Sequence, residues 1–306
     1  MNPKVIVVGS ANTDFTVQIP HLPVKGETVI GGTFTTANGG KGANQAVAAA
    51  RLGAEVTFVA RLGSDNIGSE ALESYHREGI HTGFIVRDPA LASGVALILV
   101  GGAGENMIAV ASGANWALCP EDVIQAESAI KDADCLLVQL EIPMETVLTA
   151  AKLAARHKVR VILNPAPGKE IPPELLRLVD ILTPNKEEAR ILSGESSQSD
   201  NISVLFQLAQ KTGVKNIIMT VGENGSLVYS DRRVTEVPGY QVTPVDTTAC
   251  GDAFNGALAV ALGRGQGIFQ AVRYANAVGA MAATKLGAQP SLPTAHEVDN
   301  FLADLQ

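Results

Sequence analysis

Two carboxylates and a run of small residues stand out in the segment DTTACGDAFNGALAVAL, residues 246–262. Small residues let the backbone come close to a ligand, and the free N–H groups at a helix start attract anions. The apolar segment after Gly251 predicts a helix, with Asp252 in its first turn. Asp252 is then either an acid that complements the helix dipole or a general base beside a phosphoryl group held by those N–H groups. This segment alone leaves both interpretations open.

A second glycine-rich segment, ANGGKGANQAVAAARLG at residues 37–53, leads into an Ala-rich helix. It is not a phosphate-binding P-loop, because Gly42 stands where that motif needs Ser or Thr after the Gly-Lys pair. The GxGxxG spacing of dinucleotide-binding loops is also absent. The segment is either a tight turn with a helix cap, or a place where Lys41 and Asn44 meet a ligand that the glycines allow to approach.

Polar residues follow several predicted strands, at residues 4–10, 135–141, 159–167 and 180–185. These polar residues are Asn12, Asp14, Glu141, Asn164 and Asn185. Ligands of open α/β sheets bind outside the carboxyl ends of the strands, so these residues predict one shared site. Asn185 also matches a helix capping box, because Glu188 follows it three residues later.

Predicted strands and helices alternate along most of the chain. This alternation predicts an α/β fold, with a central, mainly parallel sheet flanked by helices, that positions these residues. Helices are predicted at residues 66–78, from about 121, and at 144–157, 201–212 and 270–285. Two β-rich segments, at about 12–36, with strands near Asp14 and Val29, and at 93–112, interrupt the alternation and predict a small β-sheet that serves as a lid. With no repeat and no low-complexity linker, residues 1–306 are expected to form a single domain.

Composition agrees with helices packed closely on a sheet, because 46% of the 306 residues are hydrophobic, 18% charged and only 4% aromatic. A net charge of −8 without a basic cluster argues against nucleic acid and anionic membranes as partners. Cys119, Cys135 and Cys250 are widely spaced and predict reduced thiols. No signal peptide or membrane span is apparent, so a cytoplasmic location is expected.

Four motifs together resemble the ribokinase family of sugar kinases, also called the PfkB family. GGKGANQAVAAARLG resembles its first signature and DTTACGDAFNGAL its second; PNKEE (184–188) resembles its NxxE motif, and GAQPS (287–291) a C-terminal element. The resemblance covers essentially the whole chain. It implies a ribokinase-like fold with a lid through which such proteins commonly pair as homodimers, and ATP-dependent phosphorylation of D-ribose at the O5 hydroxyl.

The resemblance also implies roles in the sugar and phosphoryl sites. Asp252 would take the proton from the O5 hydroxyl, and the backbone N–H groups of Ala249, Cys250 and Gly251 would form the anion hole. Ribose would be held by Asn12, Asp14, Gly40, Lys41, Asn44, Glu141 and Asp252. Family members usually have Ala or another very small residue where this chain has Cys250, which raises the question of sensitivity to oxidation.

The same resemblance implies sites for the cofactors ATP, Mg²⁺ and K⁺. Glu188 would help to place Mg²⁺ and its waters. ATP would lie against Asn185, Thr220, Gly222 and Asn276. A monovalent cation, usually K⁺, would bind near Asp246, Thr248, Ala282, Lys285, Gly287 and Ser291, mostly through carbonyl oxygens.

Other substrates and another class of function stay open. Asn12, Asp14, Lys41 and Asn44 offer many hydrogen-bonding groups, which favours ribose over deoxyribose, because deoxyribokinase-like relatives tend to have an apolar residue in place of Asn12. Another pentose or a nucleoside stays open as an alternative substrate. The lid, however, has few aromatic residues to stack on the base of a nucleoside. A non-catalytic sugar-binding regulatory protein is the alternative of a different class. A hydrolase is disfavoured, because no GxSxG motif is present.

Overall fold

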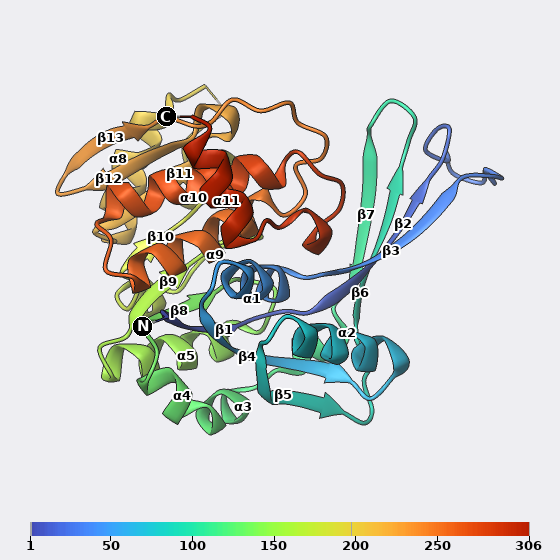
Figure 1. Cartoon of the computed structure of the whole chain (residues 1–306), viewed down its shortest axis with the longest axis horizontal. Helices are drawn as coiled ribbons and strands as arrows, with labels where there is room; N and C mark the ends of the chain where they lie inside the picture. The colour runs from blue at the N-terminus through green and yellow to red at the C-terminus, as the bar shows by residue number, and fades with distance from the viewer. Residues whose placement is uncertain (1, 197, 306) are drawn as a thin grey trace.

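The computed structural model describes residues 2–196 and 198–305. In these residues a nine-stranded sheet runs through the molecule in the order β13-β12-β11-β10-β9-β8-β1-β4-β5 (Figure 1). Its strands are β1 (Lys4–Val8), β4 (Glu55–Gly63), β5 (His81–Asp88), β8 (Cys135–Val138), β9 (Arg160–Leu163), β10 (Ile181–Leu182), β11 (Asn216–Thr220), β12 (Ser226–Ser230) and β13 (Arg233–Val237). Pairing is parallel from β11 to β5, and β12 and β13 add an antiparallel edge. The predicted fold class is confirmed.

Helices cover both faces of this sheet (Figure 1). One face carries α1 (Lys41–Arg51), α2 (Asn66–Arg77), α9 (Cys250–Gly263), α10 (Ile268–Ala282) and α11 (Ala295–Ala303). The other carries α3 (Pro120–Gln125), α4 (Glu127–Lys131), α5 (Met144–Arg156), α6 (Pro173–Leu176), α7 (Lys186–Ser193) and α8 (Asn201–Thr212). The sheet is therefore buried on both faces. In strand β1, Val5 and Val7 face one core and Ile6 and Val8 face the other. A strand buried on both faces reads as a continuous apolar run.

Helices α1 and α9 approach each other more closely than larger side chains would allow. A Cβ atom placed on Gly256 would lie 2.6 Å from the Ala48 Cβ and 2.9 Å from the Gln45 carbonyl oxygen. The Ala-rich face of α1 and the small residues of α9 thus set the distance between the two helices. This packing brings the two glycine-rich segments of the sequence to one place.

A second, four-stranded sheet stands off the body in the order β3-β2-β6-β7 (Figure 1). It is formed by β2 (Asn12–Gln18), β3 (Thr33–Gly39), β6 (Gly94–Val100) and β7 (Asn106–Ala111), which confirms the predicted small sheet. The predicted boundary at residue 36 was too early and a strand near Val29 was wrong. Strand β3 begins at Thr33 and continues to Gly39, because it pairs with β2 along its whole length, Gln18 to Thr33 through Asn12 to Gly39.

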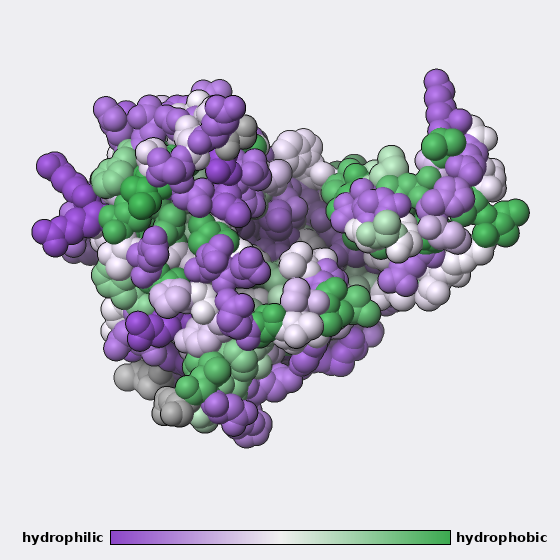
Figure 2. Space-filling model, turned by 90° about the horizontal axis from the view of Figure 1, so that it is seen from above, coloured by the Kyte–Doolittle hydropathy of each residue, from purple (hydrophilic) through white to green (hydrophobic). Residues whose placement is uncertain are grey.

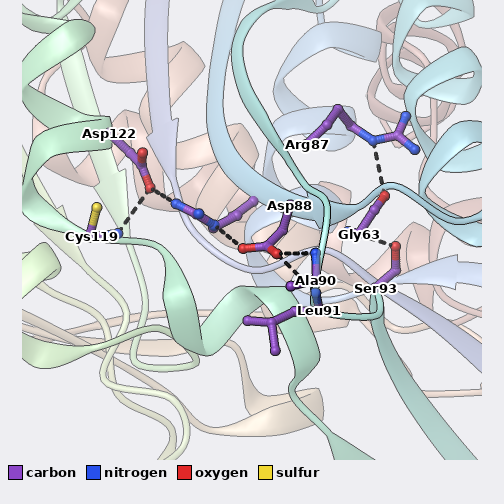
Figure 3. Close-up of polar contacts among 9 residues, drawn as sticks. Gly63, Arg87, Asp88, Ala90, Leu91, Ser93, Cys119 and Asp122 are labelled. Carbon is purple, nitrogen blue, oxygen red and sulfur yellow. Dashed lines mark hydrogen bonds and ion pairs between the residues drawn. The ribbon is translucent and has the colours of Figure 1, made fainter.

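The turn that carries the chain from β5 into the lid strand β6 is held by a charged cluster (Figure 3). Arg61 bridges the carboxylates of Asp88 and Asp122, at 2.9 Å to each. Nearby, the Ser93 hydroxyl accepts a hydrogen bond from the Gly63 N–H at 3.0 Å. Because both partners of Arg61 are well buried, these bonds fix the point at which β6 leaves the body.

Several element boundaries differ from the sequence predictions. The segment from Glu121 forms two short helices, α3 and α4, and the helix predicted at 270–285 is α10. Strands β8 and β9 end at Val138 and Leu163, before the predicted ends at 141 and 167, because the following residues turn toward the site. Among the described residues, no helix has both the length and the apolar character needed to cross a membrane.

Candidate active site

The carboxyl ends of the parallel strands bring polar residues from distant segments together, as the sequence predicted. Glu141, Asn164 and Asn185 come just after β8, β9 and β10, and Thr220 is the last residue of β11. Asn185 and Thr220 are also neighbours in an isolated parallel bridge. The edge of the sheet that faces the lid is therefore lined by amides, hydroxyls and carboxylates.

Asp252 lies in the first turn of α9, where the sequence placed it. The helix starts abruptly, because its N-cap Ala249 has the left-handed backbone conformation, with φ at 59°. The Asp252 carboxylate is only 6% exposed and accepts hydrogen bonds from Asn44 Nδ2 at 2.9 Å and Gln45 Nε2 at 3.0 Å. Its oxygens thus accept hydrogen bonds from side chains of α1, which a capping role at the start of α9 would not require.

Gln45 is a site residue that the sequence reasoning missed. It is fully buried, its Nε2 also donates to Asn164 Oδ1 at 3.1 Å, and its Oε1 accepts from Gln139 Nε2 at 2.7 Å. Both N–H groups and the carbonyl of the Gln45 amide are therefore occupied, which fixes the side chain beneath Asp252. The available signal was weak, because Gln45 lies inside an Ala-rich helical pattern whose polar positions usually face solvent.

Lys41 is surrounded by carboxylates. Burial disfavours its charge, but Asp252, Glu141 and Glu188 together outweigh burial and raise the Lys41 pKa. The backbone N–H of Lys41 also donates to Glu141 Oε2 at 3.1 Å. Burial likewise raises the pKa of Asp252, although the Lys41 charge and the Asn44 and Gln45 amides offset part of that effect. A carboxylate with a raised pKa near an ammonium can exchange a proton with a bound hydroxyl.

Asp14 projects from the lid strand β2 toward this cluster. Burial, together with the neighbouring Glu141 and Asp252, raises the pKa of Asp14 to about 6. Its carboxylate lies against the backbone of Gly39, where a Cβ atom would come within 2.3 Å of Asp14 Oδ2. The lid therefore contributes one of the carboxylates of the site.

A cavity of about 480 Å³ lies at the N-terminus of α9 and reaches Gly251, the residue before Asp252. Its walls include the predicted Thr220, Gly222 and Asn276 and also Cys250 and Gly251. Asn185 is the N-cap of α7 beside this cavity, and the next residue, Lys186, lines it. The volume suits a nucleotide, and the cavity ends at the N–H groups that were predicted to form an anion hole.

Comparisons with known proteins decide which family has this arrangement. The family model described as pfkB family carbohydrate kinase matches residues 2–295. The chain belongs to this family. It is 41% identical to a ribokinase of Haemophilus influenzae over 303 residues, covering 99% of both chains, and 33% identical to a deoxyribokinase of Salmonella typhi, covering 98% of both. A structure of Arabidopsis thaliana ribokinase complexed with ribose and ATP matches with a TM-score of 0.89 and 33% identity, covering 99% of both chains.

In this pfkB-family chain, Asp246, the other carboxylate of segment 246–262, has surroundings that differ from those of Asp252. Asp246 Oδ1 accepts from the Thr248 hydroxyl at 2.6 Å and from its N–H at 2.9 Å, and Oδ2 accepts from the Gly287 N–H at 2.9 Å. Burial would raise the pKa of Asp246, but these hydrogen bonds outweigh it and hold the pKa below its usual value. Asp246, Thr248 and Gly287, three of the residues predicted near the cation, are thus connected by hydrogen bonds.

Three further residues predicted at the cation site lie on the segment that Asp246 contacts. The backbone N–H of Asp246 donates to the Ala283 carbonyl at 3.1 Å, next to the buried Ala282. The Lys285 ammonium instead pairs with Glu297 at 2.8 Å, so only its backbone carbonyl is available for a cation. The Ser291 hydroxyl donates to the Ala288 carbonyl at 2.8 Å, which orders the end of this segment.

Glu188 performs the capping role that the sequence predicted. Its Oε2 accepts from the Asn185 N–H at 2.9 Å, while Asn185 Oδ1 accepts from the Glu188 N–H at 2.8 Å. Burial raises the pKa of Glu188, and the Asn185 N–H and the Lys41 charge oppose that rise. Its charge is thus coupled to Lys41 and Asp252 as well as to the helix. Asn276 is similarly held, because its Oδ1 accepts from the Ser226 hydroxyl at 2.7 Å.

The environment of Cys250 influences the reactivity of its thiol. Burial, together with Asp246 and Asp252, raises the pKa of the Cys250 thiol to about 11. The reactive form of cysteine is the thiolate, which is scarce at neutral pH under these conditions. The raised pKa therefore lowers the reactivity of the Cys250 thiol toward oxidants.

The buried Asp14 carboxyl predicts a stability that depends on pH. The pKa of Asp14 rises from 3.8 to about 6 on folding, so between about pH 4 and pH 6 the folded state binds more protons than the unfolded state. The Asp14 carboxyl therefore lowers the stability of the folded state as pH rises through this range. Asp14→Asn should therefore raise the free energy of unfolding at pH 8 by up to about 3 kcal/mol, with the gain shrinking from pH 6 towards pH 4. Urea denaturation of the ligand-free protein measures this difference. The exposed Glu70→Gln serves as control, and an equal effect of Asp14→Asn at pH 8 and pH 4 would contradict the assignment.

Proposed function

We propose that the protein transfers the γ-phosphoryl group of ATP to the O5 hydroxyl of D-ribose. The observation that carries this proposal is the position of Asp252, a buried carboxylate with a raised pKa that is hydrogen-bonded to Asn44 and Gln45 and follows Gly251, which lines a cavity of nucleotide size. The ribokinase relatives, and the related structure complexed with ribose and ATP, support the same substrates.

The sugar would bind where the lid meets the α1–α9 junction. Its hydroxyls would be held by Asn12, Asp14, Gly40, Lys41, Asn44 and Glu141. Asn44 supports this role, because its Oδ1 is buried without a hydrogen-bond partner while its Nδ2 binds Asp252. A buried acceptor left unpaired is costly, and a sugar hydroxyl can supply the missing donor.

Asp252 would accept the O5 proton as that oxygen attacks the γ-phosphorus and ADP leaves with the bonding electrons. Phosphoryl transfer passes through a loose, highly charged transition state, so positioning and charge neutralisation provide most of the catalysis. The N–H groups of Ala249, Cys250 and Gly251 would face the transferred group. Open space around Gly251 leaves room for it, because a Cβ atom there would meet nothing within 4 Å.

ATP would occupy the 480 Å³ cavity against Asn185, Thr220, Gly222 and Asn276. Mg²⁺, when bound, would neutralise the phosphates. Within residues 2–196 and 198–305, no cluster of three or more His, Cys, Asp or Glu side chains is placed to hold a metal, which fits an ion held mainly by phosphate and water. Glu188 suits an indirect role, because only its Oε2 is used by the capping box.

K⁺ would bind behind the anion hole, at Asp246, Thr248, Ala282, Lys285, Gly287 and Ser291. The residues fit such an ion, because they offer one ionised carboxylate and several carbonyl oxygens in two segments that contact each other. The cation would supply positive charge close to the N-terminus of α9. The loop between Asp246 and Ala249 would then be ordered by the ion as well as by its own hydrogen bonds.

The proposed reaction is tested by ADP release from ATP with a panel of sugars and nucleosides. D-Ribose should give the highest kcat/KM, above 2-deoxyribose, other pentoses and nucleosides. Asp252→Asn should lower kcat roughly 10²–10⁴-fold, because it removes the base while keeping the shape of the side chain. Ribose binding to Asp252→Asn, measured by calorimetry, should persist. Absence of sugar-dependent ADP release by the wild-type protein would instead favour a non-catalytic sugar-binding protein.

The cation proposal predicts that K⁺ raises the rate of ribose phosphorylation. Replacing K⁺ by tetramethylammonium at constant ionic strength should slow the wild-type enzyme, and Asp246→Ala should abolish the difference between the two salts. Asp304→Ala, an exposed carboxylate near the end of α11, is the matched control. A wild-type rate that is the same in both salts would refute the cation site and leave the kinase assignment intact.

A homodimer through the lid is the further part of the proposal. Phe34, Leu97 and Met107 are each more than half exposed, and strand pairing puts them on the face of the lid opposite Asp14. Figure 2 shows apolar residues on the lid, at the right of the view, with polar residues between them. Phe34 also stacks on Phe15 with ring centroids 6.0 Å apart. A contiguous apolar face of this kind is typical of an interface.

If the protein dimerises through the lid, a single charged substitution on this face should separate the subunits. Sedimentation velocity should show the wild-type protein as a dimer and Leu97→Asp as a monomer, because a buried unpaired carboxylate opposes association. Ile202→Asp is the matched control, since Ile202 is also an exposed apolar residue but lies in the first turn of α8. A monomeric wild-type protein, or a Leu97→Asp variant that stays dimeric, would contradict the proposal.

A further inference from the structure

Asn115 is a buried amide whose orientation is determined by the backbone. It lies in the short helix η1 (Gly113–Ala117), where the chain returns from the lid, and is 1% exposed. Its Oδ1 accepts from the Ala11 N–H at 2.8 Å and its Nδ2 donates to the Ala11 carbonyl at 3.1 Å. A backbone N–H can only donate and a carbonyl can only accept, so the opposite orientation of the Asn115 amide would lose both bonds.

The second N–H of Asn115 Nδ2 donates to Asn12 Oδ1 at 2.7 Å. This bond fixes the orientation of the Asn12 amide, because its oxygen must face Asn115 and its NH₂ group points the other way. Gly94 permits the contact, since a Cβ atom there would lie 2.2 Å from both Asn115 Nδ2 and Asn12 Oδ1. Asn12 and Asp14 are two residues apart in β2 and so share the face that meets the site.

We infer that Asn115 is a positioning residue for sugar specificity, which holds Asn12 so that its NH₂ group donates to the 2-hydroxyl oxygen of the bound pentose. This inference rests on the proposed function and goes beyond it, because Asn115 itself does not touch the sugar. A donor fixed in this orientation loses its partner when the sugar lacks that hydroxyl. The arrangement therefore selects ribose over 2-deoxyribose through a residue on a different segment of the chain.

The test is the ratio of kcat/KM for D-ribose to kcat/KM for 2-deoxy-D-ribose. Asn115→Ala frees the Asn12 amide to rotate, so the ratio should fall about tenfold, mainly through a higher KM for ribose. Asn12→Ala should lower the ratio as well. The double variant should have a ratio close to that of Asn12→Ala alone, because the two residues act through one group. Asn115→Asp, in which the side chain can no longer donate from an amide, is a second variant should Asn115→Ala not fold.

Thr146→Val is the matched control, because the buried Thr146 hydroxyl donates to the Leu118 carbonyl at 2.6 Å, just after η1, without contacting Asn12. It should lower the melting temperature and leave the ratio unchanged. The inference is overturned if folded Asn115 variants lose activity on both sugars by the same factor, or if the effects of Asn115→Ala and Asn12→Ala on the ratio multiply fully. Wild-type protein that phosphorylates neither sugar would instead overturn the proposed function.

Discussion

The hydrogen bonds from α1 to Asp252 are the interactions on which the site depends. Ionising a carboxylate away from water is costly, and here Asn44 and Gln45 hold it with neutral amides. An arginine in the same place would hold the carboxylate equally well but would keep its pKa low and weaken it as a base. Neutral donors fix the geometry and leave the pKa raised, and the close approach of the helices at Gly256 makes these bonds possible.

The charge balance of the cluster follows from the same constraint. Lys41 is the ammonium shared by Asp252, Glu141 and Glu188, so the protonation of each carboxyl influences the others. Asp14 adds a further carboxylate, carried by the lid, whose raised pKa reflects the negative charge already present. Groups arranged to bind a polyhydroxylated ligand repel one another in its absence, which means that stability and binding make opposite demands on this site.

Much of this site could be predicted from the sequence, because glycine-rich turns before apolar helices and polar residues after strands are local patterns. Asp252, Lys41 and Asn44 were identifiable for that reason. Gln45 and Asn115 were not, because their roles come from partners more than 90 residues away, and in the sequence they resemble ordinary polar positions. Strand β3 was misplaced for a related reason. Its pairing with β2 determines its limits, and most of its residues are exposed.

The lid has two mechanically different parts. At its root, Asn12 is nearly buried, pairs with Gly39 and is bonded to Asn115, and Gly39 leads directly through Gly40 into the helix of Lys41. Further out, every residue of β7 is exposed. The residues proposed to contact the sugar, Asn12 and Gly40 among them, therefore belong to the hydrogen-bonded root rather than to the exposed outer strand. A bend in the outer strands need not break the hydrogen bonds at the root, so it need not disturb the groups proposed to recognise the sugar.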